Sequence, residues 1–221
     1  MNYADQKLSD LAISLPLAHE IFRKNRLDFC CGGKQTLKDA CEKKKLNLSL
    51  IIEELKLLAH PENNDIKDRP LSELTHFIIE RYHNDLRTRL PDLVFLADKV
   101  EKVHHDHTHC PHGLHALLKE LHEEMLMHMM KEENVLFPLI DSGRGNMALM
   151  PVKVMSAEHD AHGKQLDEIH RLTSDFNPPK DACRSWQTLY KGLEEFEAEL
   201  MEHIHLENNI LFPRALTQFG I

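Results

Sequence analysis

The amino-acid sequence contains few of the residues that sheets and tight loops favour. Its 221 residues include only 8 glycines, 3 tyrosines and 1 tryptophan, whereas leucine, glutamate, lysine, histidine and methionine recur throughout. This composition is typical of helices. With 42% hydrophobic residues, the chain can bury the core of one medium-sized domain and a small second one. We therefore expect an all-α protein.

Long apolar runs and clusters of positive charge are also missing. No segment approaches about 18 consecutive apolar residues, and Asp5 and Asp10 lie where a signal peptide would need an apolar run. Membrane insertion and export are therefore not expected, and we place the protein in the cytoplasm. The formal net charge is −9 and no dense Lys/Arg face offsets it, which argues against a nucleic-acid partner.

The five cysteines lack the spacing of a disulfide framework. An odd number without such spacing indicates free thiols in a reducing compartment. Cys30 and Cys31 are adjacent, which makes them a poor zinc half-site, and a disulfide between neighbours is strained. Two interpretations stay open. Either the pair is a set of reactive thiols at a turn that Gly32 and Gly33 permit, or it serves only to pack that turn.

Helical periodicity divides the chain into two parts. We expect a small N-terminal helical domain over residues 1–60, a linker over 61–70 and a four-helix bundle over 71–221. The small domain contains three predicted helices, at residues 8–25 with an interruption near Pro16, 34–45 and 48–59. The bundle contains four longer ones, at residues 71–103, 114–140, 151–172 and 182–216. Four amphipathic helices with modest connections favour an antiparallel bundle.

Apolar residues recur at intervals of three and four along each long helix. In the second of them, Met125, Val135 and Leu139 lie on the predicted inner stripe together with His128 and Glu132. Polar side chains in such a stripe either satisfy each other in the core or bind something there. A lone histidine in that position is more often a core residue than a ligand. A second observation is therefore needed to decide between the two roles.

An internal repeat supplies that observation. Residues 128–138, HMMKEENVLFP, match residues 203–213, HIHLENNILFP, with an offset of 75 (203 − 128). His83 and His159, near the middles of the first and third long helices, are offset by 76 (159 − 83). We therefore interpret the bundle as a duplicated helix pair, each pair supplying one lone histidine and one His-x-x-x-Glu. Six side chains would converge in the core: His83, His128, Glu132, His159, His203 and Glu207.

Spacing and chemistry predict a metal centre at that place. Residues four apart lie on one face of a helix, so the histidine and glutamate of each string can both point inward. A buried carboxylate costs several kcal/mol unless a cation offsets its charge. Imidazole with carboxylate suits iron or manganese better than a soft metal. We expect two non-haem iron ions, bridged by the two carboxylates and by an oxo or hydroxo group, with one open position on each iron.

The same residues resemble those of a known family. The pattern of His, His-x-x-x-Glu, His and His-x-x-x-Glu is similar to that of hemerythrin-like domains. The run DFCCGGK at residues 28–34 and the string that ends in Leu-Phe-Pro are similar to the repair-of-iron-centres proteins of the YtfE/ScdA type. The resemblance covers almost the whole chain. It implies a cytoplasmic di-iron protein that restores iron–sulfur clusters damaged by nitric oxide or peroxide, with the same six ligands and with Glu132 and Glu207 as bridges.

The resemblance also implies binding partners, and it leaves alternative functions open. Expected partners are proteins with damaged iron–sulfur clusters and small ligands such as nitric oxide, peroxide or oxygen, and a homodimer stays open. An oxygen carrier has His-x-x-x-His where this chain has Glu207, so reversible oxygen transport is disfavoured. The alternatives are an oxidoreductase that reduces nitric oxide at the two irons, and a module that senses oxygen or nitric oxide.

Glu158 and several histidines outside the six predicted ligands also have to be assigned a role. Glu158 precedes His159 and sits about 100° round the helix from it, so it is not an expected ligand. It either relays protons or lines a channel, or it is a surface carboxylate. The loop at residues 104–112 holds the densest histidine cluster, which is interpreted as a solvated loop or as a weak metal site. His76 and His162 share stripes with ligands and are expected beside the site or in the core.

Overall fold

Helices make up the regular structure of this protein. The computed structural model describes residues 2–15, 17–58, 65–144 and 147–218. The regular elements in these ranges are helices, and the one β contact is an isolated bridge between Lys7 and Thr36. The expectation of an all-α protein is confirmed. Within the same ranges, no helix is both long and apolar enough to cross a lipid bilayer.

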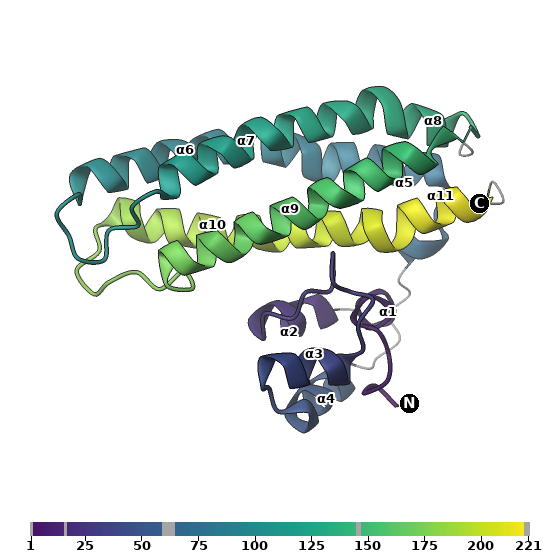
Figure 1. The fold of residues 1–221 in the computed structure, drawn as a ribbon, viewed down its shortest axis with the longest axis horizontal. Coiled ribbons are helices and arrows are strands. Elements are labelled where there is room, and N and C mark those ends of the chain that lie inside the picture. The colour runs from purple at the N-terminus through teal and green to yellow at the C-terminus, as the bar shows by residue number, and fades with distance from the viewer. Residues whose placement is uncertain (1, 16, 59–64, 145–146, 219–221) are drawn as a thin grey trace.

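Four short helices form the N-terminal part, which lies below the bundle in Figure 1. They are α1 (Leu8–Ser14), α2 (Ala18–Lys24), α3 (Leu37–Lys44) and α4 (Leu48–Leu57). The side chain of Thr36 caps α3 by accepting a hydrogen bond from the Asp39 N–H, and Asn47 caps α4 in the same way. Pro16 and residues 59–64, where a break, the domain boundary and the start of the linker are predicted, lie outside the described residues.

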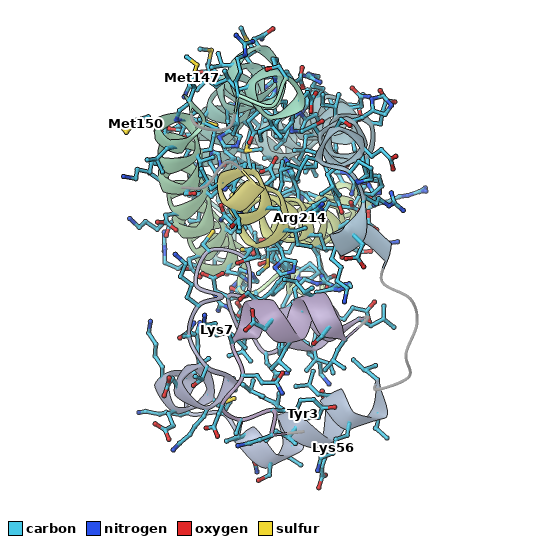
Figure 2. All side chains as sticks on the ribbon, turned by 90° about the vertical axis from the view of Figure 1, so that its right-hand side faces the viewer. Tyr3, Lys7, Lys56, Met147, Met150 and Arg214 are labelled. Carbon is cyan, nitrogen blue, oxygen red and sulfur yellow. The ribbon has the colours of Figure 1, made fainter. Side chains whose placement is uncertain are left out.

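The remaining elements form a four-helix bundle, as predicted. A short 3₁₀ turn, η1 (Asp65–Asp68), precedes it. The bundle helices are α5 (Leu71–Ile78), η2 (Ile79–His83) and α6 (Asn84–Val103); α7 (Leu114–Lys131), η3 (Glu132–Leu136) and α8 (Phe137–Asp141); α9 (Leu149–Thr173); and α10 (Arg184–Leu206), η5 (Glu207–Leu211) and α11 (Phe212–Gln218). Both α6 and α9 pack against α7 and α10. Figure 2 looks along the bundle, with Met147 and Met150 at the edge away from the N-terminal part.

Three of the four bundle helices widen into a π-helical turn. In η2, η3 and η5, the N–H groups of Asn84, Phe137 and Phe212 donate to the carbonyl five residues earlier instead of four. Proline explains two of these turns, because Pro138 and Pro213 follow the phenylalanines. A proline has no N–H for the carbonyl four residues earlier, and its ring crowds that carbonyl. Each π turn begins or ends at a predicted ligand, namely His83, Glu132 or Glu207.

The π turn in the second bundle helix overturns one part of the predicted core. Val135 is 50% exposed and Leu139 is only half-buried, whereas a constant helical period predicts both inside. Leu136 and Ile140 are buried in their place. A π turn holds one residue more than an α turn, so every side chain after Glu132 is rotated by one position, about 100°.

The core consists of two hydrophobic clusters. The larger contains Leu90 and Leu121 of the bundle and continues into the N-terminal helices through Phe29. The smaller contains Leu74 and Phe212 at the other end of the bundle. On each bundle helix, the predicted ligands lie where one cluster gives way to the other, so the polar site is sealed by apolar side chains on both sides.

The turn between α2 and α3 depends on a glycine. A Cβ atom at Gly33 would lie 2.4 Å from the carbonyl oxygen of Phe29, closer than a real side chain can come. Neither Gly32 nor Gly33 has a positive φ. The turn therefore needs the absence of a side chain at Gly33, and it does not need the left-handed backbone that glycine also allows.

Substitution of Gly33 tests this requirement. We expect Gly33→Ala to lower the free energy of unfolding by about 1–3 kcal/mol, because the added methyl group forces the backbone apart. Urea unfolding of the full chain measures the change. Gly163→Ala is the control, since a Cβ there would lie 3.9 Å from the Cys31 Sγ, an ordinary contact. Equal stability of the two variants would contradict the prediction.

Candidate metal centre

The structure brings the six predicted side chains together in the bundle core. They form two sets of four, and within each set the donor atoms lie within 4.8 Å of one another. All six side chains are buried. The first set is His83, Glu132, His203 and Glu207, and the second is His128, Glu132, His159 and Glu207. Both glutamates belong to both sets.

Each carboxylate directs one oxygen to each set. The Oε2 atom of Glu132 lies 3.4 Å from the Nε2 of His83, and its Oε1 lies 3.4 Å from the Nε2 of His128. Glu207 places its two oxygens 3.0 and 3.1 Å from the Nε2 atoms of the other two histidines. A carboxylate with its oxygens divided in this way can bridge two metal ions.

The donor atoms fit metal ions better than they fit one another. Both oxygens of Glu132 and the Oε2 of Glu207 are buried without a hydrogen-bond donor, which is costly for an ionised group. The Nε2 atoms of His83 and His203 face each other at 3.2 Å. Two ligands in adjacent positions on one metal, each about 2.1 Å from it, lie about 3 Å apart. Oxygen and imidazole donors of this kind suit iron.

The residue after each shared glutamate holds a histidine of a neighbouring helix. Glu133 accepts a hydrogen bond from the Nδ1 of His83 at 2.7 Å, and Asn208 accepts one from the Nδ1 of His159 at 2.9 Å. Such bonds fix the ring so that Nε2 faces the centre. Sequence analysis did not single out Glu133 or Asn208. The signal was present, because both occupy the same position of the repeated string.

The first and third bundle helices break this symmetry at one pair of positions, Tyr82 and Glu158. Glu158 accepts a hydrogen bond from the Nδ1 of His128 at 2.8 Å and also pairs with Lys131. Tyr82 is its counterpart in the repeat, at an offset of 76 (158 − 82), and stacks on His203 with ring centroids 5.2 Å apart. The Nδ1 of His203 is buried without a partner. His128 is therefore backed by a carboxylate, whereas its counterpart His203 is backed by a phenol ring.

A cavity adjoins the side of the site where Glu158 contacts His128. Glu158 and Lys131 line a cavity of about 340 Å³ together with Met127 and His162. His162 is buried, its ring lies 5.3 Å from that of His128, and burial lowers its pKa to about 3. The prediction that His162 lies beside the site is confirmed, whereas the same prediction for His76 is wrong, because His76 is exposed.

Burial and mutual charge act in opposite directions on the titration of the site. Burial lowers the pKa of His128, but the charge of Glu132, a hydrogen bond to it and the charge of Glu207 raise that pKa overall to about 9. Burial raises the pKa of Glu207, yet the charge of His203 and hydrogen bonds hold it well below its usual range. The metal-free site therefore keeps an ionised Glu207 and a protonated His128 near neutral pH.

The Cys30–Cys31 turn lies against the same site. The Sγ of Cys31 is 3.4 Å from the carbonyl oxygen of His159. Asn208 and Asn209 donate hydrogen bonds to the carbonyl of Cys30, at 3.4 and 3.2 Å. The N-terminal part thus contacts the backbone and the supporting side chains of the predicted ligands, a proximity that no sequence spacing encodes.

The histidine-rich loop lies at the far end of the bundle. His104 places its Nε2 3.1 Å from the Sγ of Cys183, and His107 places its Nε2 3.3 Å from the Oδ2 of Asp181. Among the described residues, the groups of three or more donors within 4.8 Å of one another include none from residues 104–112. The loop therefore contains donor pairs but no closed ligand set.

Comparison with known proteins identifies the family. Residues 75–215 match the hemerythrin HHE cation-binding domain, and residues 4–59 match ScdA_N, a domain of unknown function (DUF542). Over 218 residues, the chain is 49% identical to the iron-sulfur cluster repair protein YtfE of Pectobacterium carotovorum and 50% identical to the proteins of that name from Yersinia pseudotuberculosis and Yersinia pestis. Each alignment covers 98% of this chain and 99% of the relative. The chain belongs to the hemerythrin HHE family and, within it, to the YtfE family of iron-sulfur cluster repair proteins.

Proposed function

We propose that this chain repairs damaged iron–sulfur clusters and holds two iron ions in its bundle. One iron would bind the ligand set that contains His83, and the other would bind the set that contains His128. The observation that carries the proposal is the sharing of Glu132 and Glu207 by two buried ligand sets. It occurs in a chain that is 49–50% identical to named repair proteins over nearly its full length. Bound iron would supply redox-active cations that can take nitric oxide, peroxide or oxygen as ligands.

The residues around the site suggest which iron is exchanged. Tyr82 covers His203 in one set, while His128 in the other set contacts Glu158, which lines a cavity. Glu158 is 28% exposed at its side chain and touches both His128 and Lys131. We assign it to a channel or proton relay on this side. The iron on His128 would then leave for a client protein, and Glu158 would take the proton that His128 sheds or regains.

Nitric oxide reduction is the second candidate. It consumes protons at a buried site, and the contact of Glu158 with the Nδ1 of His128 provides a group that can deliver them. The two candidate functions differ in how many reactions one iron-loaded chain can carry out. Repair by donation uses up the iron of each chain, whereas reduction regenerates the site after each cycle.

An iron-transfer experiment separates the two. Iron-loaded protein is mixed, without oxygen and with added sulfide, with a cluster-binding protein whose cluster has been removed, and cluster formation is followed by absorbance. Repair predicts that clusters form in proportion to the iron supplied. In parallel, nitrous oxide is measured after nitric oxide and an electron donor are added. Nitrous oxide far in excess of protein, with no cluster formed, would replace repair by the enzymatic function.

Glu133 offers a test of how the site is held. We expect Glu133→Ala to weaken iron binding by about 10-fold to 100-fold, because His83 loses the partner that orients its ring. Competition with a chelator measures the affinity. Asn134→Ala is the matched control, since Asn134 is exposed and bonds only the Met130 carbonyl. A Glu133→Ala protein with unchanged affinity would contradict this role.

The remaining cellular assignments follow from the same proposal. The client would be a protein with a damaged iron–sulfur cluster, and the cytoplasm would be the compartment. All five cysteines are free in the structure, which agrees with a reducing environment. Gel filtration of the iron-loaded protein would decide between a monomer and the homodimer that the sequence leaves open.

A further inference from the structure

A second group of potential metal ligands lies in the turn between α2 and α3. The Sγ atoms of Cys30 and Cys31 are 3.7 Å apart, and the Sγ of Cys30 is 3.3 Å from the Oδ1 of Asp28. Donor atoms of all three residues lie within 4.8 Å of one another. Sequence analysis treated the two thiols as a poor zinc half-site and did not include Asp28.

The sulfur atoms have the separation of two ligands on one metal ion. With metal–sulfur bonds of about 2.3 Å and a tetrahedral angle, two thiolates lie about 3.8 Å apart. A disulfide would need a separation of about 2.05 Å. The observed distance matches the first arrangement, so adjacent cysteines form a usable pair of ligands in this turn.

The backbone holds this arrangement before any ion arrives. The Oδ1 of Asp28 accepts hydrogen bonds from the N–H groups of Cys30 and Cys31, at 3.1 and 2.9 Å, and its Oδ2 accepts one from Gly32 at 2.8 Å. Gly33 permits the close return of the chain to Phe29. A turn fixed by three backbone hydrogen bonds costs little rearrangement when its side chains bind a ligand.

The turn opens onto a cavity that residues of the N-terminal part and of the bundle line together. That cavity has a volume of about 450 Å³ and lies between the N-terminal helices and α9. Lys43, Lys44 and Lys164 line it, and no carboxylate of the described residues pairs with them. The open volume leaves the remaining coordination positions accessible to a ligand from another protein.

The turn is also adjacent to the proposed iron centre. Cys31 contacts the backbone of His159, a ligand in the set that is proposed to exchange its iron. Iron–sulfur clusters are held by cysteine thiolates. Iron that moves from the bundle to a cluster must therefore change from imidazole and carboxylate ligands to thiolates, and this turn is the thiolate group beside the bundle centre.

We propose that Asp28, Cys30 and Cys31 form a transit site for iron(II) between the bundle centre and a client protein. Its role in transfer rests on the proposed function, whereas its capacity to bind a metal does not. Binding is a ligand exchange: two Fe–S bonds form as two thiol protons pass to solvent, and iron–ligand bonds to His159 or water break. No electron is transferred.

Cobalt(II) tests the site in the full chain with its bundle already loaded with iron. Thiolate-bound cobalt(II) absorbs in the near ultraviolet, and one equivalent per chain is expected to give this band. Cys31→Ser and Cys30→Ser should lose it and keep two irons per chain. The control, Cys110→Ser with Cys183→Ser, removes the thiols of the distant loop and should keep the band. A band that survives in Cys31→Ser, or disappears in the control, would overturn the site.

Transfer of iron tests the role of the site separately. Iron-loaded Cys31→Ser is expected to supply a cluster-free client several-fold more slowly than the unsubstituted chain and the loop control. Equal rates, with the cobalt band lost in Cys31→Ser, would overturn the transit role. If the unsubstituted chain supplies no iron to any client, the proposed function fails, and the cobalt titration still decides whether the turn binds metal.

Discussion

Replacement of Glu207 by alanine is expected to reduce the iron content from the proposed two ions per chain to less than one. Glu207 contributes an oxygen to each ligand set, so one substitution removes a ligand from both. The buried site would also lose one of its two negative charges, which attract the metal cations. Iron is measured by metal analysis after gel filtration.

The matched control for Glu207→Ala lies on the same run of helix. Glu195 is an exposed residue of α10 that pairs with Lys191, and exposed pairs contribute little. Glu195→Ala should therefore keep two irons per chain. Glu207→Gln should fall between the two variants, because the amide keeps one oxygen and loses the charge. Two irons retained in Glu207→Ala would show that the ligand assignment is wrong.

Removal of the metal is expected to make stability fall as the pH rises. In the metal-free chain the pKa of His128 is raised to about 9, against about 6.5 in an unfolded chain. The proton on His128 therefore stabilises the fold below pH 6.5, and this contribution is lost as the pH rises through 9. A shift of this size corresponds to about 3 kcal/mol. Urea unfolding of chelator-treated protein at pH 6 and pH 9 measures the loss.

Iron-loaded protein is the control for this pH dependence. A metal displaces the imidazole proton, so its affinity rises with pH and the loaded protein should gain stability over the same range. The two forms are thus expected to respond to pH with opposite signs. Metal-free protein that is as stable at pH 9 as at pH 6 would contradict the raised pKa of His128.

Much of the site could be predicted because the chain contains it twice. His128 and Glu132 alone could have been core residues that satisfy each other. The second string at residues 203–213 made a shared, inward role the simpler interpretation, and the structure brings these residues together. The same duplication could have identified Glu133 and Asn208, since both follow the glutamates by one residue. Their role depends on a neighbouring helix, which periodicity along one helix does not describe.

The failures of prediction have physical causes in particular residues. Val135 was assigned to the core because periodicity assumes a constant 3.6 residues per turn, and the π turn before Pro138 adds one residue. The contact between Cys31 and His159 joins residues 128 positions apart. Such a contact is set by how the N-terminal helices pack on the bundle, so no local pattern of the sequence contains it.

The division of the core into two apolar clusters has a mechanical consequence. Bound ions would tie four helices together at the boundary between the clusters, and their departure leaves carboxylates and imidazoles facing one another across that boundary. The smaller cluster, which includes Leu74 and Phe212, then depends on its own packing alone. A chain without iron would unfold locally at that end first, so a protease would cleave iron-free molecules there faster than iron-loaded ones.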